Sequence, residues 1–422
     1  MSDALTFICI YLLLGKLALV VISRVKPISV KEMNVFTLAL LFRISLTYLY
    51  WMFSLTGSAD ARMYFNFAQF GEFNLQRMVF NPGTESVRHF TAFFYPIVRI
   101  FENQYLMTYI PFSLLGFVGS ILFYMVLKPY FNQKKGKREL YILVFFLPNL
   151  VFWTSNIGKD SLVYFGLSLV IYGSQLSKFS VKQVVSIGIG CIVSYYARPH
   201  LIMFLMFGFG AGLYLEKSRF SFKNIAVFGL IMLSFFILHQ RLFQLAGIRL
   251  DEPTEQTYEY EGRGGAGVGD YFEAGIDRLD RSAENLSIGG SATGPRRFNL
   301  IMAPLYIIEF ICSPFIWQAR TPIQLLAALE SLIYQFMLLY LLWNWKLFGK
   351  PHYVKYKFCL VMYILIMGVL LGAAQTNFGL TVRQKCMVLP FLILNFSSVR
   401  QYKKEHKVKK KIKAKPVPVN VL

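Results

Sequence analysis

A series of long apolar runs restricts this chain to few folds. Several reach about 20 residues, the length that an α-helix needs to cross the ~30 Å hydrocarbon core of a bilayer. Only 16% of the residues are charged, against about 25% in soluble proteins. The runs are approximately 4–23, 34–55, 106–127, 140–155, 161–176, 184–197, 200–215, 224–243, 301–316, 323–345, 358–374 and 386–398. They predict an all-α integral membrane protein, a polytopic bundle of about 11–12 transmembrane or re-entrant helices.

Lysine and arginine cluster in the short connectors, and this pattern predicts the orientation of the chain. Such clusters lie in the cytoplasm in membrane proteins. Here they lie at 24–31, 128–138, 178–182, 217–223, 346–357 and 400–415. The two long connectors, 56–105 and 244–300, are then outer loops. Positive-inside connectors account for much of the net charge of +22, so that no nucleic-acid partner is expected.

Residues 301–316 decide the number of spans. Pro304, Pro314 and Glu309 suit a re-entrant or interfacial helix in this segment. The alternative is twelve full spans, which puts one basic loop on the wrong side. Residues 1–399 are expected to form one membrane domain. Residues 400–422 are expected to be a basic, disordered cytoplasmic tail that contacts membrane lipids.

The sequence contains none of the common hydrolase or metal motifs. HExxH, GxSxG and Cys/His clusters are all missing. The five cysteines are scattered in or beside apolar runs, which predicts buried thiols rather than disulfides. No metal site or cofactor is predicted with certainty, and a divalent cation bound by acidic residues stays open.

Polar clusters at the outer ends of the spans contain the candidate functional residues. Ionisable groups at membrane depth are energetically costly, so each is a candidate for a functional role. Asp60 opens an amphipathic helical pattern after the second span, where it could act as a general base or cap an interfacial helix. Lys159 and Asp160 follow Gly158 between two short spans. Lys159 is expected to bind phosphate with Asp160 holding it, and the alternative is a hairpin with Asp160 as the cap.

Three further clusters add cations to the outer side. Arg198 is expected to bind phosphate, and His200, which follows it after Pro199, is a candidate for binding the same ligand. Arg383 lies between the last two spans, with snorkelling as the alternative role. The second outer loop is glycine-rich and acidic, and it carries Arg296 and Arg297 close to the membrane. It is expected to be a flexible lid over a hydrophilic ligand.

The clusters also resemble those of a known superfamily. Asp60-Ala61-Arg62-Met63-Tyr64 on an outer amphipathic helix resembles the GT-C membrane glycosyltransferases. The segments 147–160, 197–200 and 377–384 resemble bacterial envelope proteins of that type. The sequence departs from many GT-C enzymes in having one acidic residue at 59–61 instead of a pair. The likeness rests on short motifs within 58–200 and 376–391.

The resemblance implies sugar transfer from a polyprenyl-phosphate donor to an envelope glycan or glycolipid, at the outer face of a bacterial inner membrane. Asp60 would be the catalytic carboxylate. Lys159, Arg198 and Arg383 would hold the lipid phosphate and stabilise the departing oxyanion. Two alternatives stay open: a Wzy-type polymerase of O-antigen or capsule repeats, and a flippase or transporter of lipid-linked saccharides. A transporter should line a path through the bilayer with polar groups, whereas these collect at outer ends.

Overall fold

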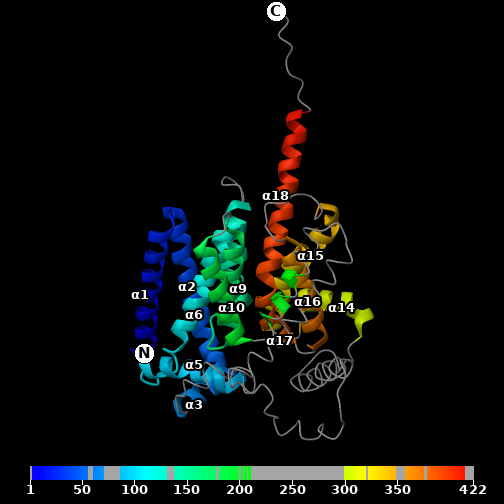
Figure 1. The fold of residues 1–422 in the computed structure, drawn as a ribbon. Coiled ribbons are helices and arrows are strands. Elements are labelled where there is room, and N and C mark those ends of the chain that lie inside the picture. The colour runs from blue at the N-terminus through cyan, green and yellow to red at the C-terminus, as the bar shows by residue number, and fades with distance from the viewer. Residues whose placement is uncertain are drawn as a thin grey trace, which may run out of the picture.

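The structure is a computed structural model, and every regular element that it describes is a helix (Figure 1). It describes residues 2–55, 60–70, 86–130, 137–176, 180–198, 201–202, 204–206, 208–210, 299–319, 322–347, 357–374 and 378–413. The apolar run 224–243 and nearly all of the second outer loop lie outside these residues.

Four of the described helices are long and apolar enough to cross a membrane. They span Asp3–Val25, Val30–Leu55, Tyr109–Tyr130 and Gln324–Trp343. Large apolar side chains on two of them are exposed: Leu13 by 69% and Leu339 by 65%. Such surfaces are rarely contiguous on a soluble monomer, and lipid would cover them. The described residues therefore fit an α-helical membrane protein, and the total of 11–12 helices stays a prediction.

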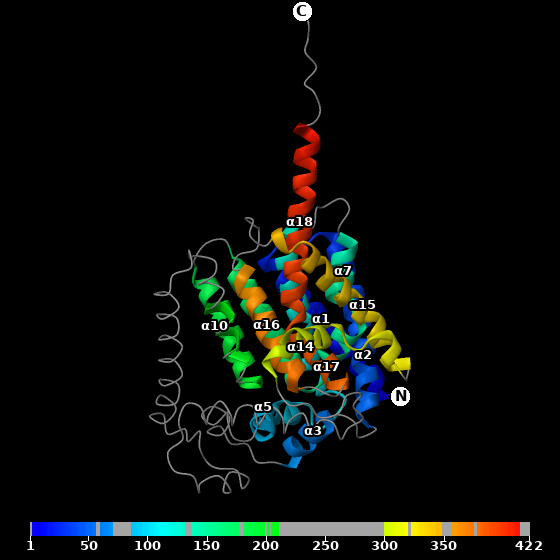
Figure 2. The ribbon, with the colours of Figure 1, turned by 90° about the vertical axis from the view of Figure 1, so that its right-hand side faces the viewer.

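The described residues up to 130 form two long spans, a pair of short helices and a third span. These helices are α1 (Ser2–Val25), α2 (Val30–Leu55), α3 (Asp60–Phe70), α5 (Ser86–Ile100) and α6 (Tyr109–Leu127), followed by the 3₁₀ turn η1 (Lys128–Tyr130). The short helices α3 and α5 pack together across the end of the bundle at which α1 begins (Figures 1 and 2). The amphipathic helix predicted after the second span is α3, and Asp60 is its first residue.

The run at 140–155 was predicted as one helix, and the structure corrects this to two. Helix α7 (Lys137–Phe145) ends before Phe146, and α8 (Pro148–Trp153) begins two residues later. Pro148 causes the break, because proline has no N–H to donate and its ring clashes with the preceding helical turn. Helices α9 (Lys159–Gln175) and α10 (Val181–Ala197) follow and pack side by side.

The described residues from 299 onward contain two short helices, two long apolar ones and a long C-terminal helix. Its elements are η3 (Leu300–Met302), α14 (Ala303–Cys312), η4 (Ile316–Gln318), α15 (Pro322–Trp343), η5 (Trp345–Leu347), α16 (Lys357–Ala374), α17 (Phe378–Gln384), η6 (Lys385–Met387) and α18 (Leu389–Lys413). Helix α14 has 10 residues. At 1.5 Å per residue it is about 15 Å long, half of the hydrocarbon core. It is therefore too short to cross as a single straight helix.

Helix α18 differs from the expected disordered tail. It continues without a break to Lys413 and extends beyond the rest of the bundle (Figure 1). Lysine has a high helix propensity, so that a helix begun by the buried residues after Leu389 can continue through the lysine-rich run. Residues 414–422 lie outside the described part of the chain.

Lysines from different connectors gather at one end of the bundle. The ammonium groups of Lys26 and Lys182 lie 4.9 and 5.9 Å from the centre of the same Tyr172 ring. Lys403 in α18 donates a hydrogen bond to the Oδ1 of Asn344, at 2.9 Å. We call this the lysine-rich end. Helices α3, α5 and α17 lie at the opposite end (Figure 1).

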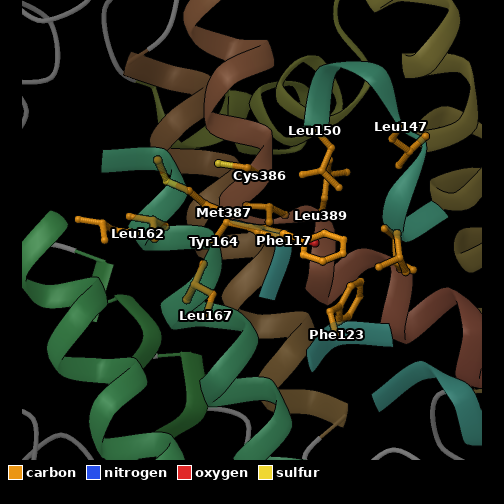
Figure 3. Packing of buried hydrophobic residues seen from close by; sticks show 14 of the residues in the cluster. Phe117, Phe123, Leu147, Leu150, Leu162, Tyr164, Leu167, Cys386, Met387 and Leu389 are labelled. Carbon is orange, nitrogen blue, oxygen red and sulfur yellow. The ribbon is translucent and has the colours of Figure 1, made fainter. Parts of the chain in front are cut away.

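The core packs α6 and α9 against the start of α18. Phe117, Tyr164, Leu167 and Met387 are at most 1% exposed and meet there, with Leu389 beside them (Figure 3). Helices α9 and α10 approach closely through glycines. A Cβ on Gly190 would lie 2.6 Å from the backbone oxygen of Gly166, which is too close for any real contact.

We expect Gly190→Ala to lower the free energy of unfolding by about 1–3 kcal/mol, the usual effect of overpacking. Backbone would have to move, because the blocking atom at Gly166 is not a side chain. Gly188→Ala on the same helix is the matched control, since its new Cβ would meet nothing within 4 Å. Thermal unfolding of the purified variants in detergent measures both. Equal melting temperatures would contradict the close packing.

Candidate active site

Asp160 occupies the centre of a polar cluster at the end opposite the lysines. It follows a tight turn, 154–158, and lies in the first turn of α9 with no solvent exposure. The Ser161 hydroxyl donates to the backbone oxygen of Asn156 at 2.8 Å, which closes this turn onto the helix. A Cβ at position 158 would lie 2.9 Å from the Asn156 amide oxygen, so that a larger residue there would displace this side chain.

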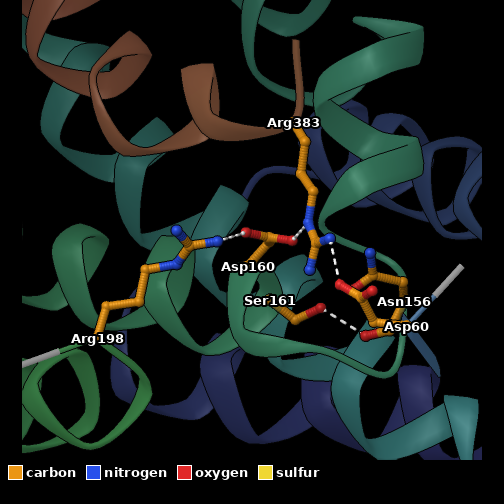
Figure 4. Close-up of polar contacts among 6 residues, drawn as sticks. All are labelled: Asp60, Asn156, Asp160, Ser161, Arg198 and Arg383. Atoms are coloured by element: carbon orange, nitrogen blue, oxygen red, sulfur yellow. Dashed lines mark hydrogen bonds and ion pairs between the residues drawn. The ribbon is translucent and has the colours of Figure 1, made fainter. Parts of the chain in front are cut away.

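Two arginines from distant parts of the chain bind the two oxygens of Asp160 (Figure 4). Arg198, at the end of α10, places its Nη2 2.9 Å from Oδ1. Arg383, in α17, donates from Nε to Oδ2. Asp160 is therefore an ion-pairing residue within the first turn of α9, and Gly158 occupies the N-cap position that the alternative reading gave to it. The positive end of the helix dipole also favours a carboxylate here.

Arg383 also reaches Asp60 and so joins two carboxylates. Its Nη1 lies 2.7 Å from the Oδ2 of Asp60. The Asp60 side chain is 48% exposed, against 12% for Arg383 and none for Asp160. Asp60 thus lies at the accessible edge of the cluster. Nearby in α3, burial and Asp60 raise the pKa of Tyr64 to about 12, so its hydroxyl keeps its proton at neutral pH.

Lys159 gives the site an excess of positive charge. Its half-buried ammonium group makes no hydrogen bond or ion pair within the described residues, although it interacts electrostatically with Arg198, Arg383, Asp160 and Asp60. Three cations therefore face two carboxylates in this part of the structure. In addition, the Nε of Arg198 is buried and has no partner among the described residues. Such a site attracts an anion with several oxygens, such as a phosphate.

A buried arginine, Arg43, contacts the turn before Asp160 and was not predicted from the sequence. It is 2% exposed and lies within the spanning helix α2. Its Nη1 donates to the Thr154 backbone oxygen at 3.0 Å and to the Ser155 hydroxyl at 3.2 Å. Its Nη2 donates to the Thr154 hydroxyl at 3.2 Å. Arg43 therefore holds the turn that leads to Asp160. Its position inside an apolar run was the signal that could have identified it.

Replacing Arg43 with Met is expected to lower the free energy of unfolding by about 2 kcal/mol or more, because buried acceptors on Thr154 and Ser155 lose their donor. Lys16→Met is the control. Lys16 is also a cation within a spanning helix, but its side chain is exposed and bonded only to Thr37 in the described structure. If both changes lower the melting temperature equally, this role for Arg43 is contradicted.

A second buried polar group lies next to the site. Glu330 accepts hydrogen bonds from the backbone N of Asn149 at 2.7 Å and from the Tyr334 hydroxyl. Lys385 donates to Ser313 O and to the Ser331 hydroxyl, the latter at 2.9 Å. Because Lys385 is buried, its ammonium group does not reach a membrane surface. The bonds of Lys385 fix η6, which begins two residues after Arg383.

Several predicted site residues cannot be placed. His200, Arg296 and Arg297 lie outside the described residues. Among those described, no group of three or more His, Cys, Asp and Glu side chains is arranged to hold a metal ion. Asp60, Lys159, Asp160, Arg198 and Arg383 do lie together, and their chemical roles stay predictions.

Comparisons of the chain with known protein families, with curated proteins and with solved structures give no match.

Proposed function

We propose that this protein transfers a sugar from a polyprenyl-phosphate-linked donor to a cell-envelope glycan or glycolipid. The observation that carries the proposal is the convergence of Asp60, Asp160, Arg198 and Arg383 from four separate helices onto one network. A network built only for stability would not need an exposed carboxylate at its edge and, beside it, an ammonium group that pairs with none of the described residues. Both features suit a site that binds an anion and removes a proton.

The cations suit the phosphate of the donor. Arg198 and Arg383 are held in place by Asp160, so their geometry is set before a ligand arrives. Donors fixed in advance stabilise charge that develops in a transition state without reorganising. Lys159 adds a charge that no described carboxylate pairs with. Phosphate that leaves the sugar gains a negative charge, which this arrangement would stabilise.

Asp60 suits the role of general base. In the proposed step an acceptor hydroxyl oxygen forms a bond to the anomeric carbon of the sugar. The bond between that carbon and the phosphate oxygen breaks, and its electron pair leaves with the polyprenyl phosphate. The hydroxyl proton passes to the Asp60 carboxylate. A general base contributes about 10²–10⁴-fold to such a rate.

The distribution of charge supports an outer-face site. Lysines gather at the end of the bundle opposite to the network. By the positive-inside rule the lysine-rich end faces the cytoplasm, with the end of α18. The network then faces the outer side of the cell inner membrane, where lipid-linked sugars are used. Helix α3 would lie along that surface.

The test is a deletion strain that is complemented with wild type, Arg198→Ala or Arg99→Ala, with analysis of surface glycans and lipid-linked intermediates. We expect the deletion and Arg198→Ala to lack one sugar and to accumulate the sugar-phosphate carrier. Arg99→Ala should restore the wild-type profile. Arg99 is an exposed arginine in α5 at the same end, and its described contacts are to Tyr95 and Gln69.

Other profiles would reject the proposal. A ladder reduced to a single repeat, with lipid-linked repeats accumulating, would identify a repeat-unit polymerase. Accumulation of lipid-linked saccharide on the cytoplasmic side would identify a flippase. A deletion that changes neither glycans nor lipid intermediates, with no redundant gene present, would exclude a role in envelope glycans.

A further inference from the structure

A cavity of about 300 Å³ opens at the lysine-rich end, away from the candidate active site. It lies between the turn that joins α1 to α2 and the end of α6. The residues that line the cavity include Lys26, Glu32, Phe36, Tyr124 and Lys128. Its volume is at the lower limit of the ~300–1,000 Å³ typical of small-molecule pockets. Nothing in the proposed transfer reaction uses this cavity.

The one carboxylate among the described residues of the cavity wall is already neutralised. Glu32 is 3% exposed and lies 2.7 Å from the ammonium group of Lys128. Its carboxylate also accepts hydrogen bonds from the Tyr124 hydroxyl at 2.6 Å and from the backbone N of Ser29 at 2.9 Å. With this many donors, Glu32 has little capacity left to pair with another cation, and Lys128 contributes no excess charge.

The positive charges of two other lysines are not neutralised by any described carboxylate. Lys26 lines the cavity, and Lys182, from α10, contacts the same Tyr172 ring as Lys26. Within the described residues neither forms an ion pair with a carboxylate; their described contacts are the two cation–π contacts to Tyr172. Both contacts leave N–H donors available. Two positive charges that no described carboxylate pairs with therefore lie close together, and one of them is in the cavity wall.

The surface beside the cavity is apolar. Val21 and Val25 of α1 are 54% and 66% exposed, and Val181 and Val184 of α10 are 80% and 52% exposed. These residues are on the two helices whose ends carry or adjoin Lys26 and Lys182. A ligand that combines a phosphate group with long apolar chains matches both parts of this surface. Lysine side chains attract such headgroups at a membrane surface.

We propose that this cavity binds the phosphate group of an anionic phospholipid, through Lys26 and Lys182, with the acyl chains along α1 and α10. The test is native mass spectrometry of the purified full-length protein titrated with phosphatidylglycerol or with phosphatidylcholine. We expect phosphatidylglycerol to bind more tightly. Lys26→Gln/Lys182→Gln should weaken its binding roughly 30-fold, because each lysine near an anionic headgroup contributes about fivefold. Lys26→Arg/Lys182→Arg, which keeps both charges, should retain binding.

The control is Lys403→Gln/Lys404→Gln, which removes the same charge at the same end of the bundle but away from the cavity. It should change the affinity for phosphatidylglycerol little. Equal losses in the two glutamine pairs, or equal binding of both lipids to wild type, would overturn the proposal. Displacement of the lipid by millimolar glycerol 3-phosphate would assign the cavity to a soluble phosphate compound and would also overturn it. None of these results depends on glycosyl transfer.

Discussion

Asp60→Asn is expected to lower the rate of sugar transfer by about 10²–10⁴-fold, the range for loss of a general base. Asparagine has nearly the same shape as aspartate and can still accept a hydrogen bond from Arg383, but it cannot take the proton of the acceptor. Arg383, the buried partner of Asp60, keeps its ion pair with Asp160, so the neutralisation of Asp60 leaves no buried charge unpaired at that position. The protein should therefore fold and reach the membrane in normal amounts.

The measurement is the rate at which surface glycan reappears in the deletion strain after induction, normalised to the amount of protein in the membrane. Low expression is needed so that a slower enzyme is not hidden by excess protein. Glu102→Gln, a neutralised exposed carboxylate at the same end of the bundle, should restore the wild-type rate. If Asp60→Asn restores it as well, Asp60 is not the base and its contact with Arg383 is structural.

Asp160→Asn is expected to lower the free energy of unfolding by about 3–5 kcal/mol, as is usual when one partner of a buried ion pair is removed. Its carboxylate holds Arg198 and Arg383, whose side chains are only 14% and 12% exposed. Both guanidinium groups would lose their buried counter-charge at once. We expect less protein in the membrane, a lower melting temperature in detergent and no transfer.

A double-mutant cycle separates this ion pair from general damage to the turn. Arg198→Gln removes one of the two cations that Asp160→Asn leaves unpaired. The double variant should therefore be more stable than the sum of the two single effects predicts, with a coupling of about 0.5–3 kcal/mol. Strict additivity of the melting data would contradict direct coupling between Asp160 and Arg198.

The charged residues of the network could be picked from the sequence because each lies at the boundary of an apolar run. Asp60, Asp160, Arg198 and Arg383 all satisfy that criterion. Their pairing could not be read in the same way. The contact between Arg383 and Asp60 joins residues 323 positions apart, and it depends on how each helix is rotated and packed. Helical periodicity fixes faces within one helix but not the neighbours of that face.

Other features were missed although the sequence carried a signal. Pro148 is present in the sequence, but the apolar run 140–155 has the length of an ordinary span. Its length therefore gives no indication of the break that Pro148 makes between α7 and α8. The run 34–55 is otherwise apolar and predicts a plain span, so that Arg43 within it is easily overlooked. The lysine-rich tail was expected to be disordered from its charge alone. The helix in this tail is an extension of a buried one. The composition of the tail alone does not show that the two are continuous.

The continuity of α18 offers a practical handle for imaging. Its first residues are buried in the core and its last described residue, Lys413, lies outside the bundle. At 1.5 Å per residue, its 25 residues measure about 37 Å along one axis. A helical fiducial protein joined in register after Lys413 would inherit the orientation of the core instead of swinging on a linker. Particle alignment in electron cryomicroscopy could then use a rigid mass on the side of the membrane opposite to the ion-pair network.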